Sequence, residues 1–80
     1  MPRYFFDTRD DDAVIVDDVG LDLAGVAEAK LYAAKSLAEL ALDALPGAAR
    51  RCLGVDVRDE RDRAVLTTEL TYEARVFEEQ

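Results

Sequence analysis

The sequence predicts an α+β domain of order β-β-α-β-β, with an antiparallel sheet of about four strands and one Ala-rich helix packed on one face. Two segments rich in β-branched and aromatic residues, each interrupted by a charged turn, flank a segment with helical periodicity. Eighty residues are enough for a single domain, residues 1–80, with a thin core. Thirteen of the apolar residues are Ala, which adds little burial per residue.

The first third of the chain predicts a β-hairpin. In residues 3–9 the side chains alternate, with Tyr4, Phe6 and Thr8 on one side of a strand and Phe5 and Asp7 on the other. Residues 10–12 are all Asp and form a polar turn, and the β-branched run 13–16 supplies the second strand. Aromatic residues lie on both faces of the first strand, whereas one helix covers only one face. We therefore regard Phe5 as a candidate interface residue.

Residues 26–45 predict the helix, with Gly25 as N-cap, Glu28 as half of a capping box, and Pro46-Gly47 after its end. Its apolar arc is about twice the roughly 100° that one sheet face requires. The arc divides into two stripes, Val26, Ala29, Ala33, Leu37, Leu40 and Ala44 on one side and Leu31, Ala38, Leu42 and Leu45 on the other. Either the helix is wedged closely over its own sheet, or the second stripe meets a second copy of the protein. We favour the dimer, because a thin core gains most from extra burial.

The last third predicts a second hairpin. Leu53, Val55 and Val57 alternate with polar residues or Gly, the charged turn 59–63 follows, and residues 64–72 alternate again. Beyond Tyr72 the pattern fits a strand extension and a helical turn equally well, so residues 73–80 are left open.

The chain as a whole resembles a family of short bacterial proteins of unknown function. The resemblance rests on the opening Met-Pro-Arg-Tyr-Phe-Phe, the Asp-rich turn 10–12, the acidic stretch 17–23, the Ala-rich helix and the hairpin at 55–66. The chain departs from the family pattern at Ala24-Gly25, where an acidic cap is common, and at Asp62, where Gly is common. The resemblance implies a bacterial setting, and it implies no activity, cofactor or site residue.

The composition excludes several kinds of site. With no His, and with Ser36 and Cys52 as the single Ser and Cys, the chain lacks the parts of a Ser-His-Asp or Cys-His nucleophilic site and of a structural zinc site. The four glycines are scattered and form no phosphate-binding loop. Beside Arg50 and Arg51, Cys52 is interpreted as a small hydrophobe at a strand start. One helix on a small sheet leaves little room for a pocket of several hundred cubic ångströms. We therefore expect no enzyme and no cofactor.

The charge of the chain is strongly acidic and uneven. The net charge is −8, which opposes binding to a nucleic acid backbone. The carboxylates concentrate in the first hairpin, where a candidate contact patch for a basic partner consists of Asp10, Asp11, Asp12, Asp17 and Asp18. These carboxylates could also converge on a cation, but the spacing of a calcium loop is absent, and we interpret them as a solvated hairpin tip.

Together these patterns predict a small non-enzymatic module that forms a homodimer and contacts another protein, and its acidic patch suits a basic partner. The candidate interface is Leu31, Ala38, Leu42, Leu45 and Phe5. The alternative is a small-ligand or metal-responsive domain whose site forms between subunits. A lone cysteine without a disulfide framework and the absence of a long apolar run predict a cytoplasmic protein with no membrane contact.

Overall fold

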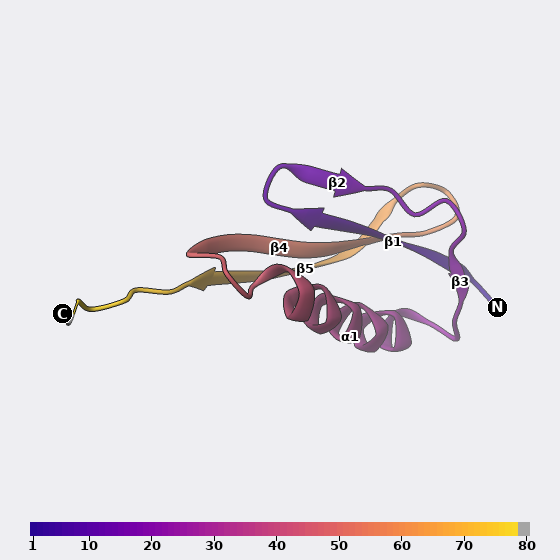
Figure 1. Cartoon of the computed structure of the whole chain (residues 1–80). Coiled ribbons are helices and arrows are strands. Elements are labelled where there is room, and N and C mark those ends of the chain that lie inside the picture. The colour runs from indigo at the N-terminus through magenta and orange to yellow at the C-terminus, as the bar shows by residue number, and fades with distance from the viewer. Residues whose placement is uncertain (79–80) are drawn as a thin grey trace.

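The computed structural model describes residues 1–78 and contains one helix and five strands in a single antiparallel sheet (Figure 1). In chain order the elements are β1 (Arg3–Asp10), β2 (Ala13–Ile15), β3 (Leu21–Asp22), α1 (Val26–Ala44), β4 (Arg50–Arg58) and β5 (Ala64–Glu73). The predicted fold class, an antiparallel sheet with one Ala-rich helix, is confirmed.

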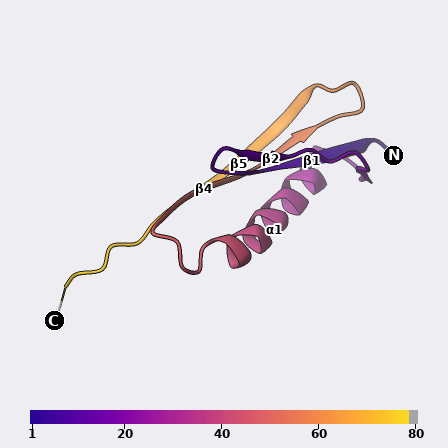
Figure 2. The same ribbon diagram turned by 45° about the horizontal axis from the view of Figure 1, so that its top comes forward.

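The two hairpins meet through their long strands. The strand order is β2-β1-β4-β5, and β3 pairs with β1 beyond the end of β2. In the β1–β4 ladder Phe6 lies opposite Val57 and Thr8 opposite Val55. Helix α1 lies along one face of this sheet, and the other face has no helix over it (Figure 2). Among the described residues, β5 pairs only with β4, so it forms one edge of the sheet.

The core lies between α1 and the two central strands. Ala29 and Ala33 are fully buried, and together with Leu37 they bring the helix close to the sheet. The sheet contributes Tyr4 and Phe6 from β1 and Leu53, Val55 and Val57 from β4. Small alanines allow a close approach, and the first predicted stripe forms the contact, although Val26 at its start is exposed.

Several boundaries differ from those that the sequence predicts. The short strand β3 is not apparent in the sequence, because two residues are too few to show a period. Strand β4 begins at Arg50 rather than near Leu53, since pairing with β5 extends it beyond the apolar alternation. The sequence left residues 73–80 undecided between strand and helical turn. In the structure Glu73 belongs to β5 and residues 74–78 have no regular secondary structure, while residues 79–80 lie outside the described part.

The two positions that depart from the family pattern each have a structural consequence. Gly25 precedes the helix in an extended conformation without a side-chain cap, and Glu28 accepts the backbone N–H of Ala24 at 2.9 Å instead. Asp62 adopts φ 63°, a left-handed conformation that Gly takes without strain. The neighbouring Asp59 holds this turn by accepting the N–H groups of Arg61 and Arg63 at 2.9 and 3.0 Å. No helix in the described part of the chain is both long and apolar enough to cross a membrane.

Candidate functional site

The sheet face that α1 leaves uncovered carries charged side chains from both central strands. Asp7 and Arg9 in β1 and Asp56 and Arg58 in β4 project on this side, because they alternate with core residues of the same strands. We call these four residues the open-face network. In the ladder Asp7 lies directly opposite Asp56, and like charges in that arrangement repel. Each carboxylate therefore needs a nearby cation.

Arg9 neutralises Asp56 diagonally across the ladder. Its Nε and Nη2 donate to the two carboxylate oxygens of Asp56 at 2.7 and 3.2 Å. Arg9 can take this position because Gly54 lies opposite it, where a Cβ would be 2.1 Å from Nη2. The Thr67 hydroxyl also donates to Asp56. The Arg9 hydrogen bond outweighs the opposing effect of burial, and it lowers the pKa of Asp56 from its ordinary value.

Arg58 neutralises Asp7 in the same diagonal manner. Its Nε and Nη2 donate to the Asp7 carboxylate at 2.9 and 3.3 Å. The guanidinium also lies over the Phe5 ring, with 4.7 Å between the Arg58 Cζ and the ring centroid. Phe5, a predicted interface residue, is thus half-buried beneath an arginine of its own chain.

Asp17 closes the gap between β2 and β3 along the edge of β1. One of its oxygens accepts the Phe6 N–H at 3.1 Å, and the other accepts the N–H groups of Val19 and Gly20 at 2.9 and 3.2 Å. Burial acts to raise the pKa of Asp17, but these three donors and the charge of Arg58 act against it, and the net pKa is lowered. Between β2 and β3, where no strand pairs with this edge of β1, the ionised Asp17 side chain therefore supplies the hydrogen-bond acceptor for Phe6.

The structure divides the predicted acidic patch into two groups at opposite ends of β2. Asp10 and Asp11 both bind Arg51, at 3.0 and 3.2 Å, and Asp11 also accepts the backbone N–H of Cys52 at 3.0 Å. Asp12 and Asp18 are exposed, and no residue in the described range 1–78 donates to their side chains. Three of the five predicted contact carboxylates thus have structural partners inside the fold.

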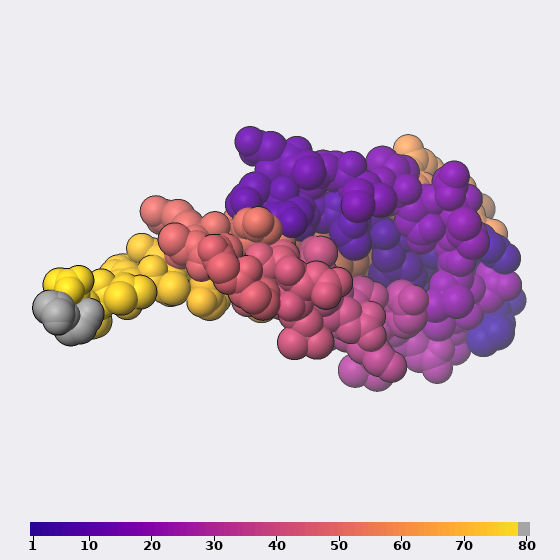
Figure 3. Space-filling view, viewed as in Figure 1, coloured from indigo at the N-terminus to yellow at the C-terminus, as the bar shows by residue number. Residues whose placement is uncertain are grey.

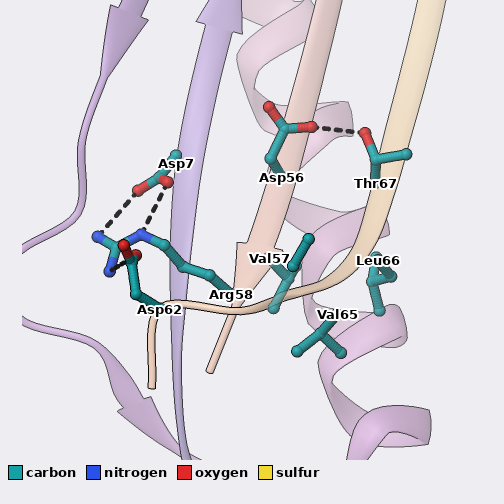
Figure 4. A pocket seen from close by; sticks show the side chains of 9 residues that line it. Asp7, Asp56, Val57, Arg58, Asp62, Val65, Leu66 and Thr67 are labelled. Atoms are coloured by element: carbon teal, nitrogen blue, oxygen red, sulfur yellow. Dashed lines mark hydrogen bonds and ion pairs between the residues drawn. The ribbon is translucent and has the colours of Figure 1, made fainter. Parts of the chain in front are cut away.

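A hollow of about 380 Å³ lies beside the open-face network, where the β4–β5 turn curls over the sheet (Figure 4). From the sequence we expect little room for a pocket of several hundred cubic ångströms, and this hollow is open to solvent on the surface, beside a register irregularity between Val57 and Arg58. Polar and apolar side chains both line the hollow, among them Asp7, Asp56, Arg58, Asp62, Val65 and Thr67.

The chemistry available at this hollow is limited. Each carboxyl whose pKa departs clearly from its ordinary value in residues 1–78, namely Asp17, Asp56 and Asp59, has a lowered pKa. General acid catalysis at neutral pH requires a raised one. In the same range no group of three or more Cys, Asp or Glu side chains is placed to hold a metal ion. Within the open-face network the arginines and carboxylates neutralise one another in pairs.

Comparison with known proteins identifies the family. The sequence of residues 3–71 matches a family described as "Domain of unknown function (DUF6894)". The chain belongs to this family. No curated protein and no solved structure gives a significant match. The matched range of the DUF6894 domain begins with β1 and includes all of α1 and β4 and most of β5.

The other residues that the sequence singled out in the DUF6894 domain lie on α1, directly after it, or in β4. Leu31, Ala38 and Leu42 are exposed, with Leu31 at 72% and Leu42 at 75% of full exposure. Leu45 follows the last turn of α1 and is half-buried against the core. Cys52, interpreted as a small hydrophobe, is half-buried, and its thiol lies 3.4 Å from the Glu69 carboxylate.

Sequence reasoning did not find the open-face network in the DUF6894 domain, although a signal for it exists. Both central strands contain Asp-x-Arg, at Asp7 and Arg9 and at Asp56 and Arg58. When two antiparallel strands of this pattern pair with the carboxylates opposite each other, each arginine reaches the other strand's carboxylate diagonally. The signal can be used only once β1 and β4 are known to be neighbours.

Proposed function

We propose that this domain is a non-enzymatic protein-interaction module that associates with a second copy through the outer surface of α1. The observation that carries the proposal is the exposure of Leu31 and Leu42, two large apolar side chains about 20° apart around the helix axis. Ala38 lies between them, so they form one apolar row on the side of α1 that faces away from the core. Covering such a row removes apolar surface from water.

The charged network supports the same proposal. A catalytic or ligand-binding role would require free donors or carboxylates of raised pKa, whereas Arg9 and Arg58 are engaged by Asp56 and Asp7. The uncovered sheet face is polar and internally neutralised. The apolar row on α1 is thus better suited to a second copy than the open sheet face is.

The experiment is sedimentation-velocity ultracentrifugation of the purified chain over a micromolar concentration range. We expect a monomer–dimer equilibrium, and we expect Leu31→Glu and Leu42→Glu each to raise the dimer Kd about tenfold or more. Val16→Glu is the matched control, because Val16 is 64% exposed, lies outside α1 and likewise exchanges an aliphatic side chain for Glu. A wild-type chain that stays monomeric at high micromolar concentration would refute the proposal.

A basic protein is proposed as a further partner, on the grounds of the surplus of carboxylates. Asp12 and Asp18 have no partner in the described residues and belong to a chain with a net charge of −8. Binding of a fluorescent poly-lysine peptide would be measured at low and high salt. Weaker binding on Asp12→Asn with Asp18→Asn, and loss of binding at high salt, would support this part, and unchanged binding by the double variant would contradict it.

The alternative, a ligand-responsive site between subunits, depends on the same association. Because no metal-binding cluster lies within residues 1–78 of one subunit, a metabolite is the better candidate. A thermal-shift screen tests it, and a flat response would count against it. We further propose a bacterial, cytoplasmic setting, which the resemblance and the lone Cys52 support, and fractionation of cells expressing a tagged copy tests the compartment.

A further inference from the structure

The free edge of β5 and the segment that follows it make a self-complementary surface. The last backbone bond between β5 and β4 is donated by the Ala74 N–H to the Ala49 carbonyl at 2.8 Å. Beyond it the chain leaves the sheet, and residues 74–78 project from the body of the molecule (Figure 3). Val76 in this segment is 90% exposed, and Phe77 is also exposed.

The backbone N–H and C=O groups of successive residues in β5 point alternately toward β4 and toward the open edge. Since Ala74 bonds to the β4 side, the even-numbered residues of β5 direct their N–H and C=O groups toward β4. The odd-numbered residues, among them Glu69, Thr71 and Glu73, direct theirs outward, where no strand of the described chain pairs with them. An added antiparallel strand would satisfy these groups.

A groove of about 360 Å³ borders the same edge on the helix side. Its lining comes from the end of α1, the following turn and β5, namely Ala41, Leu42, Leu45, Pro46, Gly47 and Tyr72. Two of these residues, Leu42 and Leu45, belong to the apolar stripe that the sequence singles out. The groove is therefore an apolar binding surface beside the unpaired edge of β5.

We propose that β5 pairs with β5 of a second copy about a two-fold axis at Ala74, so that each projecting segment lies along the edge of the other copy. This inference rests on the proposed self-association and adds a contact between edge strands to it. Within one chain Arg75 already lies 3.5 Å from Glu73, and in this register it also lies opposite Glu73 of the second copy on both sides of the axis. The paired edges thus bring two pairs of opposite charges together. Arg75 and Glu73 are both odd-numbered, so their backbone groups also point toward the second copy.

The same register fills the groove. Val76 comes opposite Tyr72 of the second copy, and it lies on the helix side because it continues the even-numbered alternation of Leu70 and Tyr72. The side chain then covers the apolar groove beside Leu42 and Leu45. An axis at Thr71 would instead place Glu69 opposite Glu73, where like charges repel. An axis at Tyr72 also pairs opposite charges, Arg75 with Glu69, but it places Val76 opposite Thr68 rather than Tyr72. The apolar contact therefore selects Ala74 as the centre.

Disulfide cross-linking tests the register in the full chain. Cys52→Ser removes the native thiol and keeps a hydroxyl near Glu69. In that background Ala74→Cys places two cysteines opposite each other across the axis with Cα atoms about 4.5 Å apart, a distance that a disulfide spans. We expect mild oxidation to convert most of this variant to a covalent dimer and little of the matched control Thr71→Cys. Efficient cross-linking at Thr71, or none at Ala74, would overturn the register.

Charge exchange tests the pairing without cysteines. Arg75→Glu and Glu73→Arg should each raise the dimer Kd about tenfold, and the double variant should return it to near the wild-type value. Arg61→Glu, in the exposed turn at the other end of β5, is the control and should leave the Kd unchanged. If Leu42→Glu weakens the dimer and the Arg75 and Glu73 variants do not, the α1 association stands and the strand pairing is refuted. A monomeric wild-type chain would refute both.

Discussion

Gly54 affects the structure through the side chain that it lacks. It is buried in β4 and leaves the space in which the Arg9 guanidinium lies, and that position lets one arginine bind Asp56 with two hydrogen bonds. The Arg9 side chain also reaches the Thr68 carbonyl at 3.4 Å and Glu69 at 3.8 Å. A single position without a side chain thus allows three strands to be connected through one cation.

We expect Gly54→Ala to lower the free energy of unfolding by about 2 kcal/mol, because the new Cβ displaces Arg9 from Asp56 and also lies 2.9 Å from the Thr68 carbonyl oxygen. Urea denaturation followed by circular dichroism measures the loss. In an Arg9→Ala background the same substitution should cause a clearly smaller loss. Equal losses in the two backgrounds would show that Arg9 is not the reason.

Helix α1 shows how a secondary structure element can be held by its packing with little help from its ends. It has no side-chain N-cap, and no basic residue stands in its last turn. Its position comes from Ala29, Ala33 and Leu37 against the sheet. Because burial rather than capping stabilises this helix, its first turn offers room for improvement.

Gly25→Ser should raise the free energy of unfolding by about 0.5–1 kcal/mol, since Ser can accept an N–H of the first turn and restricts the unfolded chain. No atom lies within 4 Å of a Cβ at this position, and φ 179° suits any residue. The midpoint of urea unfolding measures the gain. Gly25→Ala, which has the Cβ without the hydroxyl, separates the two contributions, and equal midpoints for both variants would exclude the cap.

The whole molecule combines a large net charge with an arrangement that neutralises many of its carboxylates locally. Arg3, Arg9, Arg51, Arg58 and Arg63 each bind at least one Asp. Backbone N–H groups bind Asp17 and Asp59. The acidic composition therefore contributes to holding the fold as well as to its surface charge.

This arrangement sets the pH dependence of stability. The pKa of Asp17 is lower in the fold than its usual value of about 3.9, so the stability it contributes is present above that value and is lost as the pH falls through the folded pKa. Asp17→Asn should lower the free energy of unfolding at pH 7 by on the order of 1–2 kcal/mol. The difference from wild type should begin to shrink below about pH 4, where Asp17 of the unfolded chain takes up a proton while Asp17 in the fold is still ionised.

Urea unfolding at pH 7, 5, 4 and 3 measures this difference. Asp12→Asn is the control, because Asp12 is exposed and has no partner in the described residues, and it should change stability little at any of these pH values. A gap between Asp17→Asn and wild type that stays constant down to pH 3 would show that the ionised carboxylate is not what stabilises the fold.

The sequence by itself determined the features that depend on near neighbours along the chain. Alternation of apolar side chains defined the long strands, the 3.6-residue period and Pro46-Gly47 defined α1, and residue composition defined the charged turns. The alignment of Leu31, Ala38 and Leu42 in one row also follows from the helical period alone, whereas their exposure is known only from the fold. Each of these features extends over a few residues, so local pattern is sufficient to predict it.

The tertiary structure alone decided which distant segments meet. The Arg9–Asp56 pair joins residues 47 positions apart, and Arg58 meets Asp7 across 51. The same dependence on β1 lying beside β4 explains why Asp10 and Asp11 belong to a free acidic patch in the sequence but bind Arg51 of β4 in the fold. Asp17 is held instead by Phe6 of β1 and by Val19 and Gly20. Strand order is set by burial of the whole apolar face, to which every segment contributes, and no local window of the sequence contains it.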